Sequence, residues 1–155
     1  MDPPDAFDPE CYSCQASEGT RGLHTGAGIF QGEYWNVRHA YPTSVPGWSI
    51  MILKRHARAP HELSKPEIGE LGMLLGRVAT AIHDELGTET ECVGLFAEKE
   101  HFRHVHVHLI PRSPKRPAGL NRLRLFSRSP PGGGDGLRPE EIGEMCRHLR
   151  RRLQA

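Results

Sequence analysis

Three histidines alternate with apolar residues in one short run, and this run constrains the fold and chemistry of the chain most. Residues 104–110 read His-Val-His-Val-His-Leu-Ile and are followed by Pro111. Strict alternation predicts a β-strand with one polar face and one buried face. The three imidazoles are therefore expected to share a face, with the interleaved valines and Leu109 against a core. Pro111 is expected to end the strand.

The remaining patterns predict a single α+β domain over residues 1–155. Ser64 and Glu67 form a capping box before an apolar helical repeat that Gly87 would end. Pro139 opens a second helical repeat. The expected elements are a hairpin over 29–38 turning at Gly32, a strand over 48–53, a helix from 65 to 86, a mostly buried strand over 91–98 antiparallel to the histidine strand, and a C-terminal helix over 138–153. Residues 1–10 are expected to be a loose lead-in, 15–28 a loop, and 113–136 a loop or linker.

Composition narrows the class of protein. Hydrophobic residues make up 37% of the 155, and the net charge is +1 with neutral histidines. We therefore expect no membrane and no nucleic-acid partner. The acidic, proline-rich start is unlike a signal peptide, and four cysteines are too few for a disulfide framework, so we expect a cytoplasmic protein. Cys92 is expected to be a small core residue.

Two of the cysteines are spaced as half of a metal site. Cys11 and Cys14 form a Cys-x-x-Cys pair, the usual spacing of a zinc half-site. By itself the pair fits a zinc site, a redox pair or a coincidence, and zinc needs two further ligands.

The histidine run resembles the signature of the histidine triad (HIT) superfamily, in which three histidines alternate with apolar residues. The resemblance extends from Cys11 to about Arg112 and includes the Val45-Pro46-Gly47-Trp48 turn. It implies a HIT-like antiparallel sheet of about five strands carrying the long helix and the C-terminal helix, and a homodimer. It also implies a nucleotide hydrolase or nucleotidyl transferase that cleaves a phosphoanhydride or phosphoramidate. His106 would attack the α-phosphorus to give a nucleotidyl-histidine, and His108 would bind the reacting phosphate.

One branch of that superfamily, which resembles dinucleoside-polyphosphate hydrolases and galactose-phosphate uridylyltransferases, carries a structural zinc. The resemblance places its ligands at Cys11, Cys14, His56 and His104. A closed Cys2His2 set leaves no coordination position for substrate, so this metal would tie the N-terminal arm to the sheet.

The chain departs from the family pattern near the substrate. Glu100 and His101 stand where many members have Gln and Ser or Thr, so His101 is either a general acid for the leaving group or an ordinary loop residue. The acid or Asn that usually holds the ribose is absent. Asn36, His39 or Tyr41 lies in that region, and we expect Asn36, His39, Glu100 and His108 to contact substrate.

Two other functions fit the same residues. One is a zinc-stabilised nucleotide-binding module with weak or no catalysis, which the altered segment before the triad allows. The other is a hydrolase in which the three histidines bind a catalytic metal.

Overall fold

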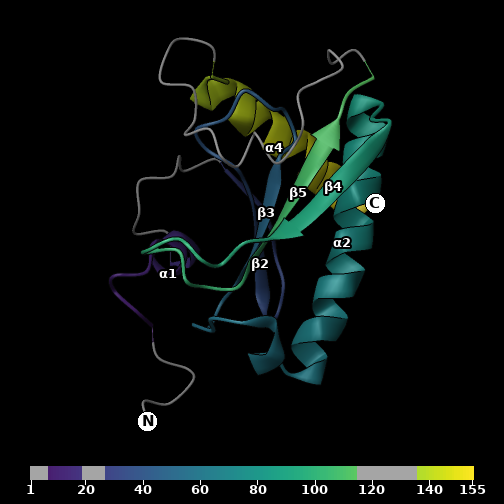
Figure 1. Ribbon diagram of the computed structural model, residues 1–155. Coiled ribbons are helices and arrows are strands. Elements are labelled where there is room, and N and C mark those ends of the chain that lie inside the picture. The colour runs from purple at the N-terminus through teal and green to yellow at the C-terminus, as the bar shows by residue number, and fades with distance from the viewer. Residues whose placement is uncertain (1–6, 19–26, 115–135) are drawn as a thin grey trace.

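The sheet and helices predicted from the sequence are present in the computed structural model, which describes residues 7–18, 27–114 and 136–155 (Figure 1). Five antiparallel strands lie in the order β1-β2-β3-β5-β4, which confirms the α+β class. The strands are β1 (Gly28–Gln31), β2 (Trp35–His39), β3 (Ser49–Leu53), β4 (Thr90–Leu95) and β5 (His106–Arg112). The helices are α1 (Tyr12–Ser17), α2 (Lys65–Leu86) and α4 (Pro139–Gln154), with a 3-10 turn at Pro60–Glu62. No helix of the described residues is long and apolar enough to cross a bilayer.

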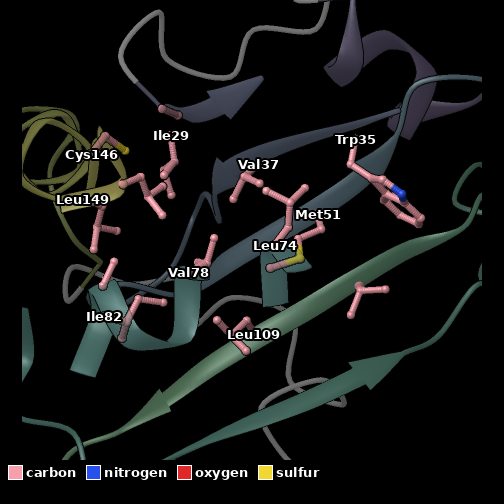
Figure 2. Packing of buried hydrophobic residues seen from close by; sticks show 14 of the residues in the cluster. Ile29, Trp35, Val37, Met51, Leu74, Val78, Ile82, Leu109, Cys146 and Leu149 are labelled. Carbon is pink, nitrogen blue, oxygen red and sulfur yellow. The ribbon is translucent and has the colours of Figure 1, made fainter. Parts of the chain in front are cut away.

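The core lies between one face of the sheet and the helices α2 and α4. Alternate strand residues point into it, as the period of two requires. Figure 2 shows α2 and α4 side chains meeting those of β1, β2, β3 and β5. The labelled members are Ile29, Trp35, Val37, Met51, Leu74, Val78, Ile82, Leu109, Cys146 and Leu149.

The short helix α1 lies on the opposite face of the sheet (Figure 1). Asn36 Nδ2 donates to Ser17 Oγ over 2.8 Å, and Arg38 Nη1 donates to the Ala16 carbonyl over 3.2 Å. Both β2 side chains therefore point away from the core. The prediction of a loop over 15–28 is wrong at both ends, because residues 15–17 belong to α1 and Gly28 begins β1. This outer face also carries the histidines of β5.

The histidine strand differs from the expectation at both ends. It begins at His106 rather than His104, because the Val105 amide donates to the Ala57 carbonyl before the strand starts. It also continues through Pro111 to Arg112. Pairing with β3 ends at Leu109, so beyond that residue β4 is the one strand of the described residues that pairs with β5. A proline lacking an N–H is tolerated at such an unpaired edge.

The strand β4 is shorter and more exposed than expected. It pairs with β5 as predicted, but it is the outermost strand of the sheet. Val93 is 55% exposed, and Cys92 is only partly buried rather than in the core. The expected loop over 113–136 lies outside the described residues except at its ends, as does most of the expected lead-in.

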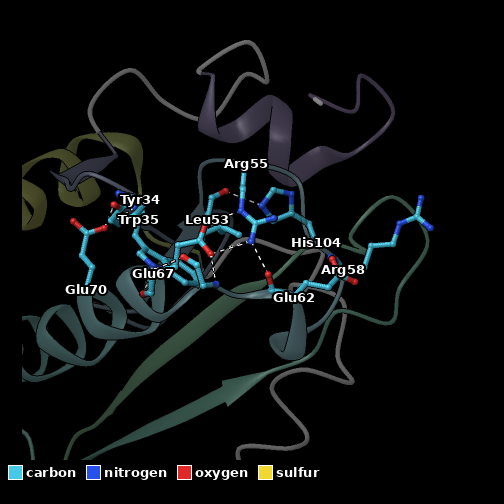
Figure 3. Close-up of polar contacts among 10 residues, drawn as sticks. Tyr34, Trp35, Leu53, Arg55, Arg58, Glu62, Glu67, Glu70 and His104 are labelled. Atoms are coloured by element: carbon cyan, nitrogen blue, oxygen red, sulfur yellow. Dashed lines mark hydrogen bonds and ion pairs between the residues drawn. The ribbon is translucent and has the colours of Figure 1, made fainter. Parts of the chain in front are cut away.

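The helix α2 begins and ends where the sequence predicted. Ser64 Oγ accepts from the Glu67 amide and the Glu67 carboxylate accepts from the Ser64 amide, which completes the capping box. Gly87 ends the helix with φ of 60°, a left-handed conformation that favours glycine. The Glu67 carboxylate also accepts from Arg55, with Nε 2.6 Å away (Figure 3).

Replacing Glu67 by glutamine should make the protein less stable at neutral pH but not in strong acid. The hydrogen bonds from Arg55 lower the pKa of Glu67 from 4.5 to about 2, and the residue is 4% exposed. A carboxyl with a lowered folded-state pKa stabilises the fold fully above pH 4.5, and the contribution is lost as the pH falls toward 2. The difference between a pKa of 4.5 and one of about 2, at about 1.4 kcal/mol per pKa unit, predicts a loss of about 3 to 4 kcal/mol at pH 7.

Urea unfolding of both proteins between pH 2 and 7 measures this difference. The matched control is Glu89→Gln, whose ion pair with Arg112 is exposed and should contribute little. A Glu67→Gln deficit that stays constant down to pH 2 would contradict the assignment.

Candidate functional site

The ring of His106 is held in one tautomer. Its Nδ1 lies 2.7 Å from the His104 carbonyl oxygen, which only accepts, so Nδ1 carries the proton. The other nitrogen, Nε2, therefore keeps its lone pair. Burial lowers the pKa of His106, which is 7% exposed, so the imidazole is neutral near pH 7. A neutral imidazole with an oriented lone pair is a competent nucleophile.

His108 lies next to His106 and has the opposite tautomer. The ring centroids of the two histidines are 5.0 Å apart. The indole Nε1 of Trp48, a donor only, lies 3.1 Å from His108 Nδ1, so Nδ1 accepts and Nε2 carries the proton. Burial, reinforced by the neighbouring His106, lowers the pKa of His108 to about 3. His106 thus offers an electron pair where His108 offers an N–H.

Replacing Trp48 by phenylalanine should remove the hydrogen bond that defines the His108 ring. We expect a loss of about 1 kcal/mol in the free energy of unfolding, the usual net value of one hydrogen bond. The ring should then populate two orientations, and its 15N signals should broaden or split. Trp35→Phe is the control, since its indole donates to the Glu67 carbonyl instead. Sharp, unshifted His108 signals in Trp48→Phe would show that the indole does not orient the ring.

Four metal-type ligands converge beside the start of β5. One ligand atom from each of Cys11, Cys14, His56 and His104 lies within 4.8 Å of all the others. His104 Nδ1 is 3.5 Å from Cys11 Sγ and 3.3 Å from Cys14 Sγ. A tetrahedral zinc with bonds of about 2.0 to 2.3 Å brings its ligand atoms to such separations. The predicted assembly of these four residues therefore exists in the fold.

The surroundings of this group suit a metal ion. His104 Nε2 lies 2.7 Å from the Leu53 carbonyl, so Nε2 carries the proton and the Nδ1 lone pair faces the thiols (Figure 3). Burial raises the pKa of the Cys14 thiol to about 12, so a thiolate there needs a bound cation. Tyr12–Ser17 follows the first cysteine as α1, so one ion would join this helix to the ends of β3 and β5.

The segment before the histidines lies against the N-terminal arm. His101 has a φ of 64°, and its ring stacks on Tyr12 with centroids 4.9 Å apart. Both Glu100 and His101 are exposed and line a cavity of about 410 Å³ beside the metal-type ligands. Phe102 contacts the Tyr12 ring edge-on, and its centroid is 6.4 Å from that of His106. The predicted roles of Glu100 and His101 stay predictions.

The other predicted substrate contacts lie on β2, at different depths. Asn36 is on the outer face, in register with Ile52 and, one strand further, with His106. His39 is on the core face, where Nδ1 donates to the Ala40 carbonyl and Nε2 accepts from the Gly47 amide. In this structure His39 fixes the Pro46-Gly47 turn, and substrate contacts for either residue stay predictions.

Sequence reasoning missed Trp48 and Arg38. Trp48 is separated from His108 by 60 positions, and only the pairing of β3 with β5 brings the two rings together. Arg38 could have been found from the alternation in β2, which puts it on the same face as Asn36. The helix α1 gave no signal because six residues are too short for a helical repeat to show.

Comparison with known proteins identifies the fold. No family model and no curated protein matches the sequence, but solved structures match. A Zn-bound histidine triad family protein from Mycobacterium smegmatis has a TM-score of 0.66 and 17% identity, over 93% of each chain. A Hit-like protein from Bartonella henselae matches with a TM-score of 0.69 and 14% sequence identity, and the match covers 95% of this chain and 98% of its own. Plasmodium falciparum diadenosine triphosphate hydrolase matches with a TM-score of 0.60 and 14% sequence identity, and the match covers 83% of this chain and 77% of its own. The chain has the histidine triad fold.

Proposed function

We propose that this protein is a nucleotide hydrolase or nucleotidyl transferase that acts through a covalent nucleotidyl-histidine at His106. The observation that carries the proposal is the hydrogen bond from His106 Nδ1 to the His104 carbonyl, which leaves Nε2 unprotonated. Among the described residues, that Nε2 has no hydrogen-bond partner. The Plasmodium protein of the same fold, a diadenosine triphosphate hydrolase, supports a phosphoanhydride as the substrate, and we include phosphoramidates in the proposal because the same attack on phosphorus would cleave them.

The first step forms one bond and breaks another at the α-phosphorus. His106 Nε2 donates its electron pair to phosphorus, and the leaving group departs with the electrons of its own bond. The ring becomes a cation, and its Nδ1–H bond to the His104 carbonyl strengthens because the acceptor faces a developing positive charge. Water, or an acceptor alcohol in a transferase, then attacks phosphorus and gives up its proton to solvent, and the P–N bond breaks with its electron pair returning to Nε2.

The neighbouring groups divide the remaining tasks. His108, with Nδ1 held by Trp48, presents an N–H to a phosphate oxygen as charge develops on it. His101 would protonate the leaving group. Glu100, Asn36 and His39 are the predicted substrate contacts, and of these Asn36 shares the outer face with the reacting histidines.

We also propose that Cys11, Cys14, His56 and His104 hold a structural zinc. The histidine triad protein from Mycobacterium is Zn-bound, and the four donors here are the Cys2His2 set of closed structural sites. When bound, zinc would supply a cross-link between the arm and the sheet and no open coordination position. His104 would then serve two purposes, because its ring faces the thiols and its carbonyl holds His106.

The geometry argues against a catalytic metal held by all three histidines. Among the described residues one group of metal-type ligands converges, and it contains His104 without His106 or His108. His106 Nδ1 is bonded to a carbonyl and His108 Nδ1 to an indole. The three histidines are therefore each oriented by different neighbours, and the described structure does not gather them around one point.

Trapping the intermediate tests the proposed function. The protein is mixed with dinucleoside polyphosphates or nucleoside phosphoramidates, quenched in base, and digested for mass spectrometry. We expect one nucleoside monophosphate on the peptide that carries His106, and none in His106→Ala. Nucleotide binding without adduct or turnover would instead support the zinc-stabilised binding module.

We further propose that the protein is a homodimer that pairs through β4. This edge strand carries Val93 and is followed by Phe96, which are 55% and 44% exposed. An exposed apolar edge strand invites pairing with another strand. Light scattering should give twice the chain mass, and Val93→Lys should give the monomer. A wild-type monomer at micromolar concentration would contradict the proposal.

A further inference from the structure

A second polar cluster lies on the same face of the sheet as the reacting histidines, two strands away. Arg38 in β2 is in register with Ile50 in β3, which is in register with His108 in β5. Asn36, Ile52 and His106 form the parallel row. Strands are about 4.8 Å apart, so Arg38 and His108 have Cα atoms about 10 Å apart. The two isoleucines form an apolar floor between the two polar ends.

A cavity of about 500 Å³ lies at the Arg38 end. Ser17, Asn36, Arg38 and Arg150 contribute polar groups to it, and none of its lining residues is acidic. Gly28 is in register with Arg38, and a Cβ added at Gly28 would meet nothing within 4 Å. Among the described residues, no side chain or backbone therefore fills the space next to Gly28 on this face.

The polar groups of this cluster are incompletely satisfied. Asn36 is 9% exposed, its Nδ2 donates to Ser17 Oγ, and its buried Oδ1 has no hydrogen-bond partner among the residues that the structure describes. Arg38 donates from Nη1 to the Ala16 carbonyl, while its buried Nε has no partner in the described part of the chain. No carboxylate of the described residues pairs with Arg38.

A half-buried cation without a counter-charge destabilises the folded state, because it loses part of its hydration and gains no ion pair. Desolvation by burial lowers the pKa of Arg38, which reports the same cost. Buried charges in proteins are ordinarily paired, and guanidinium groups match phosphate and carboxylate in bidentate geometry. An anionic ligand would supply the missing pairing in this cavity.

We propose that Arg38 and Asn36 form a subsite for a second phosphate on the nucleoside side of the substrate. The proposal rests on the proposed function, because it places the first phosphate at His106 and His108. The sugar or base would lie over Ile50, and the second phosphate would reach Arg38. The substrate class is thus a nucleotide phosphorylated at both ends, such as a 3′-phosphorylated nucleoside 5′-phosphate derivative.

Equilibrium binding of two matched nucleotides tests the subsite without turnover. Adenosine 3′,5′-bisphosphate and adenosine 5′-monophosphate are titrated into the zinc-loaded wild-type protein by calorimetry. A hydrogen bond to a charged group is typically large enough for an affinity difference on the order of tenfold or more. We expect the bisphosphate to bind more tightly by that factor.

Variants assign the preference to Arg38. Arg38→Gln should abolish the preference for the bisphosphate. Arg38→Lys should keep part of this preference, since lysine retains the positive charge but cannot donate two parallel hydrogen bonds to a phosphate. Arg147→Gln is the matched control, because this exposed α4 arginine does not line the cavity. Thermal unfolding and metal content verify that each variant keeps α1 in place.

The outcomes separate this subsite from the proposed function. Equal affinities for the two nucleotides in the wild type, or a preference that survives Arg38→Gln, would overturn the subsite alone. If neither nucleotide binds and no covalent adduct forms, the proposed function is overturned, and the subsite with it.

Discussion

Replacing His106 by alanine should lower nucleotide turnover by about three orders of magnitude or more, because it removes the only atom proposed to bond to phosphorus. The change should leave the fold intact, since the ring makes one described hydrogen bond, to the His104 carbonyl. The measurement is kcat/KM for the nucleotide substrate found by the trapping experiment. Nucleotide affinity should change much less, since binding depends on other groups.

The control for that variant is a histidine outside the site. His61 is exposed in the 3-10 turn, so His61→Ala should keep full turnover. His106→Gln keeps a polar side chain of similar length but has no nucleophilic nitrogen, and it should be as inactive as His106→Ala. Turnover within a few-fold of wild type in either His106 variant would exclude covalent catalysis at this residue.

Removing the metal should destabilise the protein by several kcal/mol and release the N-terminal arm. Structural zinc sites contribute folding free energy directly, and chelation removes it. In a chain of this size about 1 kcal/mol shifts the unfolding midpoint by 2 to 4 °C, so we expect a decrease of about 10 °C or more. Calorimetric scans with and without chelator measure it, and limited proteolysis should show new cleavage near α1.

Cys14→Ser should reproduce the effect of chelation without any chelator. Its matched control is Cys92→Ser, since Cys92 lies in β4 and away from the four ligands. Metal analysis of the purified protein should give one zinc per chain. Reduced thiols at Cys11 and Cys14 with no bound metal, and an unfolding midpoint insensitive to chelator, would refute the structural zinc.

The proposed nucleophile, His106, should also respond to the metal, through His104. The ring of His104 faces both thiols, while its carbonyl accepts from His106. Loss of the ion would free the ring and loosen the carbonyl that fixes the His106 tautomer. Because His104 directly precedes β5, we expect the stability of the arm to be coupled to the orientation of the His106 ring.

Local patterns in the sequence determined most of the fold. The capping box at Ser64 and Glu67 and the glycine at 87 set the ends of α2, because they satisfy backbone groups within one turn. Alternation predicted that Val107 and Leu109 face the core and that His106 and His108 face outward, because a strand has a period of two. The hairpin at Gly32 and the C-terminal helix followed from equally local signals.

Expectations were wrong where distant segments decide the conformation. His104 is outside β5 because Val105 pairs with Ala57 instead, and Pro111 is inside it because β3 has already ended. The exposure of β4 follows from its place at the edge of the sheet. The order of strands in a sheet depends on how they pair, so the residues of one strand do not predict it. No short window of sequence contains both partners of such a contact.

The sequence by itself determined the types of residue at the site and their spacing: two cysteines three positions apart, and three histidines at intervals of two positions. The tertiary structure decided which atoms each of these groups contacts. It gave His104 and His106 opposite tautomers through the carbonyls of Leu53 and His104, and it oriented His108 with Trp48. It also set Arg38 across the sheet from those histidines. Tautomers and facing pairs depend on which atoms meet in space, and those atoms are supplied by strands far apart in the chain.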